Sequence, residues 1–307
     1  MSGEGGWNGP MVDAHQHFWE PRRGRNPWLL PAARIPFRYG DYEAIKRSYL
    51  PEDYRGDADG HEVVETVYVE TEWDPGDGLG ETRYATALAE RHGWPNAIVA
   101  QAWLDRPEAA EMLAAQAAFP LVRSVRHKPG GPQDPRDVGT QCSLMSDRAW
   151  RRGYAALSRH GLHFDLQTPW WNLPEAVALA RDFPDTLIVL NHAGLPADRS
   201  EEGLRGWRDA MAHLAGCPNT RVKISGLGLP GRAWRVEDQR GVVRETIAIF
   251  GAARCMFASN FPVDSLCASL DTIFAGFKRI TADMPPDQQA LLFRDTARET
   301  YRTGTTP

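Results

Sequence analysis

Short apolar stretches alternate with longer amphipathic stretches along almost the whole chain. Several of the apolar stretches are uninterrupted, which is typical of strands in a parallel sheet that is covered on both faces. The pattern predicts eight strands, at residues 11–14, 63–69, 97–104, 121–125, 162–166, 186–190, 221–224 and 255–259.

Stretches in which apolar residues recur with helical spacing follow these strands. They predict helices at residues 81–92, 107–118, 147–160, 172–182, 201–214, 236–250 and 287–301. Eight strands that alternate with helices indicate an α/β fold, a distorted (β/α)8 TIM barrel. We expect one such domain over residues 11–307. Residues 1–10 are expected to be a disordered or loosely held leader that carries no chemistry.

The segment 18–60 breaks this alternation because it is rich in proline, arginine and tyrosine. Only a short helix, near residues 41–48, is predicted inside it. We interpret the segment as a long first βα loop that caps the mouth of the barrel.

Composition narrows the class of protein further. The formal net charge of -5 over 307 residues gives no cationic surface for nucleic acid or for an anionic membrane. No apolar run approaches the roughly 18 residues of a membrane helix. The four cysteines lie far apart, without a CxxC pair, which excludes a structural zinc knuckle and suits a reducing compartment. We therefore expect a cytoplasmic protein with a small-molecule substrate. A homo-oligomer is compatible with this composition.

In a TIM barrel the chemistry is carried by residues that follow the strands, at the C-terminal face. His15 and His17 follow the first strand and are two positions apart, so both rings can reach one ion or one substrate atom. His192 follows the sixth strand. Together the three histidines would complete a site for one divalent metal, for which zinc is the first choice. Catalysis without a metal is the alternative.

Other polar residues follow the remaining strands. Arg126, with His127 and Lys128 next to it, could polarise a carbonyl or bind a carboxylate. The alternative for Arg126 is an ordinary ion pair with a neighbouring carboxylate. Lys223 could act as a base in the lumen, but a buried lysine more often balances a buried carboxylate. The further candidates at the mouth are Glu70, Gln167, Asn260 and Asp264.

Tryptophans also gather after the strands, and flat apolar rings suit a cyclic substrate. The candidates for substrate binding are Trp19, Trp73, Trp170 and Trp171. For any one of them, packing of the upper layer of the barrel is the alternative. As a set they favour a small cyclic organic substrate.

Six motifs in this order resemble the amidohydrolase-2 branch of the amidohydrolase superfamily. They are VDAHQHFW at 12–19, VRH at 125–127, FDL at 164–166, LNHAG at 190–194, VKISGL at 222–227 and FASNFPVD at 257–264. Within that branch they are most similar to the sugar-lactone hydrolases, such as fuconolactonase and rhamnonolactonase, and to the pyrone-dicarboxylate lactonases. The resemblance implies a barrel that hydrolyses an ester or amide, with His15, His17 and His192 as the ligands in members that use a metal.

The chain departs from the family pattern at two positions. Asn260 stands where an aspartate is usual, and a carboxamide cannot take a proton from water near neutral pH. The base is then Asp264, His192 or Glu70, or an ion alone activates the water, or hydrolysis has been lost. Gln167 stands where members with two metals carry a histidine, so a second metal is not expected.

These observations predict a hydrolase that opens a small cyclic ester, first of all a sugar-acid lactone, by attack of water on the carbonyl. Arg126 or His127 would stabilise the oxyanion, and Asn260 or Asp264 would orient the water. One alternative is a metal-dependent, non-oxidative decarboxylase of the same branch. The other is an inactive barrel that only binds a ligand.

Overall fold

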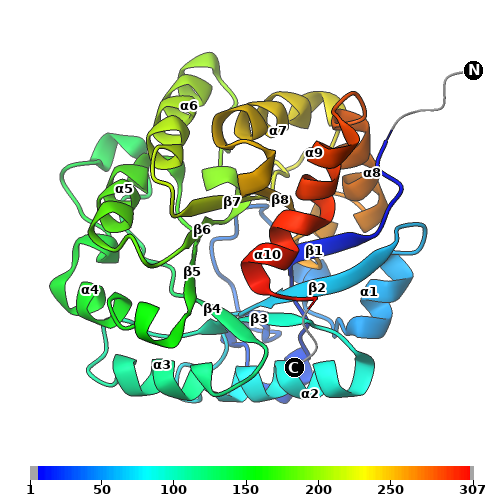
Figure 1. Cartoon of the computed structure of the whole chain (residues 1–307). Helices are drawn as coiled ribbons and strands as arrows, with labels where there is room; N and C mark the ends of the chain where they lie inside the picture. Colours follow the sequence, from blue (N-terminus) through cyan, green and yellow to red (C-terminus); the bar gives the residue numbers. More distant parts are fainter. Residues whose placement is uncertain (1–5, 305–307) are drawn as a thin grey trace, which may run out of the picture.

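The computed structural model describes residues 6–304, and eight parallel strands form the centre of the molecule (Figure 1). The strands pair in the order of the sequence, each with the next along the chain. They are β1 Met11–Gln16, β2 Val63–Val69, β3 Ala97–Gln101, β4 Val122–Arg126, β5 His163–Leu166, β6 Ile188–Leu190, β7 Thr220–Ile224 and β8 Cys255–Phe257.

The residues after β8 bring the last strand against the first. The amide of Asn260 donates to the carbonyl of His15 at 2.8 Å, and the amide of His17 donates to the carbonyl of Phe261 at 2.7 Å. These bonds nearly close the sheet on itself. The prediction of a (β/α)8 barrel is therefore confirmed, while residues 1–5 of the expected leader lie outside the described residues.

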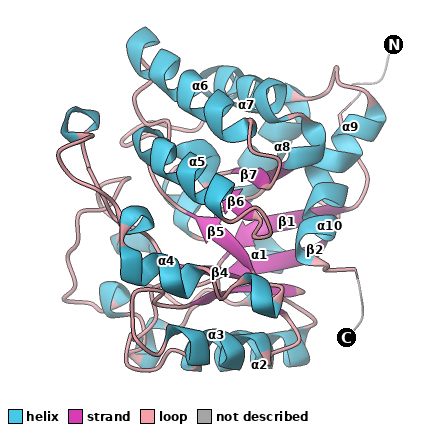
Figure 2. Ribbon diagram, turned by 60° about the vertical axis from the view of Figure 1, so that its left-hand side comes forward, coloured by secondary structure: helices cyan, strands magenta, loops and turns pink. Residues whose placement is uncertain are grey.

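Helices surround the strands on the outside of the barrel (Figure 2). They are α1 Pro51–Asp57, α2 Gly80–His92, α3 Ala109–Ala117, α4 Arg148–Tyr154, α5 Leu173–Asp182, α6 Glu201–Ala215, α7 Val236–Phe250, α8 Leu270–Ile280, α9 Pro286–Ala290 and α10 Thr296–Tyr301. The sequence pattern missed α1 and α8. The helix expected at 287–301 is divided, because the π-helical segment Leu291–Asp295 separates α9 from α10. No helix among residues 6–304 is both long and apolar enough to cross a membrane.

The end of the barrel opposite the mouth is covered by α10. Tyr301 is fully buried and donates its hydroxyl to the carboxylate of Asp165 on β5, at 2.9 Å and 3.1 Å to the two oxygens. His163, the first residue of β5, contacts the carbonyl of Thr300 at 2.9 Å. Because the strand starts meet α10, the strand ends are left to form the site.

The long loop between β1 and β2 folds over the mouth. Its two ends are tied together, since Trp19 and Tyr49 exchange backbone hydrogen bonds of 3.0 Å and 2.9 Å. The helix expected near 41–48 is wrong, because only one 3-10 turn forms there, at Glu43–Ile45. Regular structure begins instead at Pro51, where proline suits the first helical position and Asp53 accepts from the amide of Leu50 at 2.8 Å.

Candidate active site

A cavity of about 380 Å³ opens at the C-terminal ends of the strands, under the long first loop. Side chains from β1, β2, β4, β5, β6 and β8 and from the segments that follow these strands line it, together with the loop. The lining residues are His17, Trp19, Trp28, Ile35, Pro36, Phe37, Arg38, Glu70, Thr71, Glu72, Arg126, Lys128, Gln133, Gln167, His192, Asn260 and Val263. We call this space the main chamber. Its position matches that of active sites in other TIM barrels.

The three histidines meet at the floor of the main chamber, where His17 and His192 line the cavity and His15 packs against them without lining it. The ring of His15 lies 5.0 Å from that of His17 and 4.6 Å from that of His192, centre to centre. All three residues are buried. Burial, with the positive charges around the site, lowers the pKa of each imidazole, that of His17 to about 3. The histidines are therefore neutral near pH 7, which is the form that can accept a proton or bind a metal.

Hydrogen bonds fix the tautomer of His17. Its Nδ1 lies 2.7 Å from the carbonyl of Val69, and since a carbonyl only accepts, Nδ1 must carry the proton. In the neutral ring Nε2 then holds a lone pair. That atom faces Oδ1 of Asn260 at 3.4 Å. Two acceptors thus face each other, an arrangement that a water molecule or a cation between them would satisfy.

The donor set of the floor fits a divalent metal. Both ring nitrogens of His15 are buried and make no hydrogen bond among the described residues. Nδ1 of His192 is held by the hydroxyl of Ser225 at 2.8 Å, and neutral imidazoles oriented by such outer partners are the usual ligands of zinc. The types of donor therefore fit a metal, but their present positions do not: no group of three or more His, Cys, Asp or Glu side chains among residues 6–304 is arranged to hold an ion.

Asn260 is part of a buried polar chain. Its Nδ2 donates to Oδ1 of Asp264 at 2.6 Å, so the amide oxygen is the atom that faces His17. Asp264 also accepts from the hydroxyl of Tyr39 at 3.0 Å and from Arg38 at 3.4 Å. Burial raises the pKa of Asp264, although these partners partly offset that effect. Asp264 is only 1% exposed and lies behind Asn260, so it orients the amide.

Arg126 and Glu70 form a buried ion pair on the wall of the main chamber. Nε and Nη2 of Arg126 bond the carboxylate and the carbonyl of Glu70, and Nη1 donates to Gln167 at 3.0 Å. Burial alone would raise the pKa of Glu70, but the charges of Arg126 and Lys128 outweigh it and the net pKa is lowered. These contacts use three of the five N–H bonds of the guanidinium, and the other two can donate to a ligand.

Lys223 lies below the chamber and does not line it. It is fully buried, and its Nζ lies 2.7 Å from Oδ2 of Asp165. Ser124 and Asn191 donate to the same carboxylate at 2.8 Å and 2.9 Å. Burial lowers the pKa of Lys223. The environment matches that of a lysine that balances a buried carboxylate.

We expect Lys223→Met to lower the free energy of unfolding by about 3–5 kcal/mol, because it leaves the Asp165 carboxylate buried without its cation. Urea unfolding of Lys223→Met, and of the double variant with Asp165→Asn, measures this. The double variant should regain part of the loss. A single variant that keeps its stability but loses all activity would instead identify Lys223 as a base.

The remaining predicted residues divide into two groups. Trp73 and His127 line a smaller space beside the main chamber. Trp170 and Trp171 are half-buried and line neither space among the described residues, and the indole of Trp171 donates to the carbonyl of Pro132 at 2.8 Å. The sequence reasoning did not single out the loop residues that line the main chamber, which are Trp28, Ile35, Pro36, Phe37 and Arg38. The signal that could have identified them is the high density of aromatic residues and arginine in the first loop.

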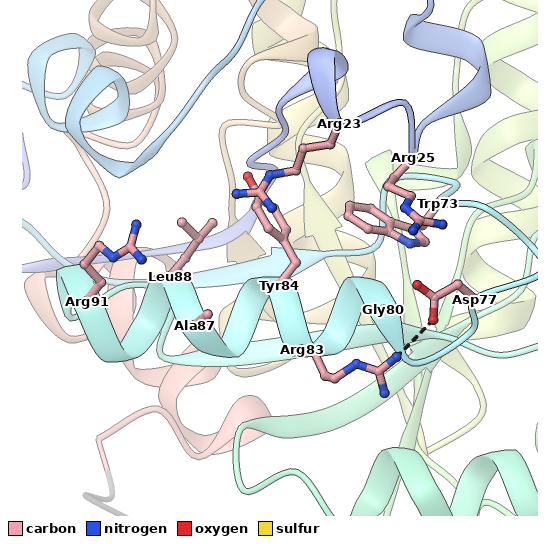
Figure 3. A pocket seen from close by; sticks show the side chains of 10 residues that line it. All are labelled: Arg23, Arg25, Trp73, Asp77, Gly80, Arg83, Tyr84, Ala87, Leu88 and Arg91. Atoms are coloured by element: carbon pink, nitrogen blue, oxygen red, sulfur yellow. Dashed lines mark hydrogen bonds and ion pairs between the residues drawn. The ribbon is translucent and has the colours of Figure 1, made fainter.

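A larger cleft of about 600 Å³ lies away from the histidines, between the first loop and α2 (Figure 3). Arg25 and Arg83 are paired there with Asp74 and Asp77, at 3.2 Å and 3.0 Å. No histidine lines this cleft among the described residues. The main chamber, not this cleft, is therefore the candidate active site.

Two residues that line the main chamber have strained backbones. His192 and Asn260 have φ values of 56° and 57°, in the left-handed region that non-glycine residues seldom adopt. Such strain concentrates at functional sites, where the surrounding structure enforces it. Neutral imidazoles and an arginine in one cavity at the mouth of a TIM barrel define this chain as a barrel enzyme.

Comparison with known proteins assigns the family. A sequence model of the amidohydrolase family matches residues 12–303, and the chain belongs to this family. It is 38% identical to an uncharacterised protein of Sinorhizobium fredii, over 95% of this chain and 98% of that one. It is 30% identical to an L-fucono-1,5-lactonase of Burkholderia ambifaria, over 95% of both chains. The chain is therefore a hydrolase.

A solved structure supports the same assignment. The amidohydrolase of Burkholderia multivorans with bound zinc superposes with a TM-score of 0.78 at 26% identity, over 96% of this chain and 99% of that chain. The resemblance inferred from the six motifs is thereby confirmed at the level of the family.

Proposed function

We propose that the enzyme opens a small cyclic ester, with a sugar-acid lactone as the first candidate, by attack of water on the carbonyl carbon. One observation carries the proposal. The lone pair of His17 Nε2 and the amide oxygen of Asn260 face each other at 3.4 Å in the chamber that Arg126 also lines. A water molecule bound to one of these two acceptors would keep its second proton for a base and direct an oxygen lone pair into the chamber.

The residues have distinct proposed roles. His192, neutral and held by Ser225, would accept the proton that the attacking water loses. The two available N–H bonds of Arg126 would stabilise the oxyanion that forms at the carbonyl. When the C–O bond of the ring breaks, the same proton would pass to the leaving oxygen, giving a hydroxy acid. Glu70 keeps Arg126 in position.

His15, His17 and His192 would hold a metal if one is bound, and His192 would then be a ligand instead of the base. A divalent ion there would polarise the carbonyl and lower the pKa of water. The proposal assigns zinc first, because all three donors are imidazoles and a relative was solved with zinc.

The second candidate is a non-oxidative decarboxylase of the same family. The observation that favours it is the amide at position 260, because decarboxylation needs no carboxylate that activates water. Its substrate would be an aromatic acid, and its product carbon dioxide.

A pH-indicator screen against aldono- and sugar-acid lactones tests the proposal, first with chelator and then with added zinc or manganese. Acid release above the uncatalysed rate supports a lactonase, and its loss with chelator supports the metal. No acid release by folded protein, together with carbon dioxide from an aromatic acid, would support the decarboxylase. Stabilisation by a ligand without turnover would support the binding protein.

A further inference from the structure

A second space of about 270 Å³ adjoins the main chamber. We call it the side chamber. The two chambers share the five residues that separate them, which are Trp28, Glu70, Glu72, Arg126 and Lys128. Arg126 therefore borders both chambers, and a ligand bound in either one can contact it. The residues of the side chamber that do not line the main chamber are Pro27, Trp73, Pro75, Gln101, Ala102, Trp103 and His127, and of these Trp73 also lines the larger cleft of Figure 3.

The walls of the side chamber are flat and apolar. Trp28, Trp73 and Trp103 contribute three indole rings, and two prolines and an alanine complete the surface. The indole of Trp28 already donates to the carbonyl of Thr71 at 2.8 Å. The guanidinium of Arg106 lies 5.1 Å from the ring centre of Trp103 and covers it. Rings fixed in this way form a slot for a planar group.

Several polar atoms at the side chamber have no partner among the described residues. Nε1 of Trp73, Nε1 of Trp103 and Oε1 of Gln101 are all buried and make no hydrogen bond. Gln101 is 5% exposed and Trp73 is 6% exposed. Because these atoms are buried, they do not reach the open space, and the residues that carry them present mainly carbon atoms to a ligand.

His127 supplies the N–H donor of the side chamber, and its tautomer is fixed. Its Nδ1 accepts from the amide of Leu104 at 3.1 Å and from the indole of Trp150 at 3.0 Å. Two donors can point at one nitrogen only if that nitrogen carries no proton, so the proton is on Nε2. Burial lowers the pKa of His127, which keeps the ring neutral. Apart from the ion-paired residues that it shares with the main chamber, the side chamber thus offers a single N–H donor, Nε2 of His127.

This surface suits a planar aryl ring better than a sugar. Each hydroxyl of a sugar gives up hydrogen bonds to water when it enters a space walled by indole rings, prolines and an alanine, and a single donor replaces few of them. A planar ring with one oxygen acceptor loses less, because its faces are apolar and its oxygen can accept from Nε2 of His127. We propose that the side chamber binds an oxygen-substituted aryl group, so that the substrate is an aryl-substituted cyclic ester. The identity of the ester part rests on the proposed function.

Trp103 supplies the test, because it lines the side chamber and not the main one. We compare kcat/KM for γ-phenyl-γ-butyrolactone and γ-methyl-γ-butyrolactone in the wild type, in Trp103→Ala and in Trp103→Phe. The control is Trp7→Phe, where the ring stacks on Phe293, 6.1 Å away. Trp103→Ala should lower the ratio of aryl to methyl about tenfold or more, whereas the control should keep it, since buried aromatic contacts dominate binding. Trp103→Phe, which keeps a smaller ring, should lie between them.

Binding of 4-hydroxyacetophenone, measured by calorimetry, tests the side chamber without turnover. This probe has one planar ring, one carbonyl acceptor and one hydroxyl. The wild type should bind it, and Trp103→Ala should bind it about tenfold or more weakly. Binding that depends on Trp103 in an enzyme that opens no lactone would retain the side chamber and overturn the proposed function. Lactone opening with an unchanged ratio and unchanged binding in Trp103→Ala would overturn the side chamber alone.

Discussion

The variant His192→Asn is expected to open lactones about 10²–10⁴-fold more slowly than the wild type, because it removes the group that takes the proton from water. Asparagine is the informative replacement. Its amide can keep the hydrogen bond that Nδ1 makes to Ser225, while Nε2 is lost. Asparagine also tolerates the left-handed backbone at this position, where φ is 56°. Alanine would lose both advantages.

Stability should therefore change little in His192→Asn. The midpoint of urea unfolding and the single-turnover rate on a lactone, measured on the same preparation, separate the two effects. Ser225→Ala is the matched control, because it removes only the partner that orients the ring. Loss of such an outer partner typically costs about 10–100-fold. Full activity in His192→Asn would refute the role given to His192, whatever the control does.

The architecture was predictable because it follows from local patterns. Strands buried on both faces give apolar runs, and the runs were counted correctly without knowledge of their contacts. The prediction of a short helix near residues 41–48 was wrong, because contacts with residues outside the local pattern decide the structure of this segment. The segment is packed by its aromatic side chains, as with Phe37 and Tyr42, whose ring centres are 4.9 Å apart. Tertiary packing of this kind overrides helical spacing and leaves no periodic signal.

The site was predictable only in part. Barrel topology places every strand end at one mouth, so the proximity of His17, Arg126 and His192 followed from their positions in the sequence. The side chains that wall the main chamber from the first loop did not follow, because a loop without periodicity does not reveal which side chain points inward. The tautomers of His17 and His127 depend on the partners Val69 and Trp150, which are distant in sequence.

Asp264 illustrates the same limit. From the sequence it was a candidate base after the last strand. The structure places it behind Asn260, where Asn260, Tyr39 and Arg38 engage its carboxylate. The amide at 260 is thus one member of a connected set. A change at that position must be accommodated by the whole set, which makes Asn260→Asp a demanding test.

We expect Asn260→Asp to lower the free energy of unfolding by about 3 kcal/mol near pH 8, since it places a second carboxylate against a buried one. In the wild type Nδ2 of Asn260 lies 2.6 Å from Oδ1 of Asp264, and burial already raises the pKa of Asp264. Two carboxylates in such contact cannot both be ionised, so one pKa rises strongly.

The sign of the pH dependence follows from proton counting. The folded variant keeps a proton that the unfolded chain releases above about pH 4. Its stability relative to the wild type should therefore be complete only below about pH 4, and it should fall as the pH rises towards the folded pKa, by about 1.4 kcal/mol for each unit that separates the folded and unfolded pKa values. Urea unfolding at several pH values between these limits measures the slope.

The exchange variant, Asn260→Asp with Asp264→Asn, is the control, because it restores one carboxylate and one amide at the same contact. It should recover most of the stability lost near pH 8. We expect kcat/KM to fall in the single variant, since Arg38 bonds Asp264 and also walls the main chamber. A rise in kcat/KM without loss of stability would contradict both expectations, and it would mean that a carboxylate at position 260 is what limits the native enzyme.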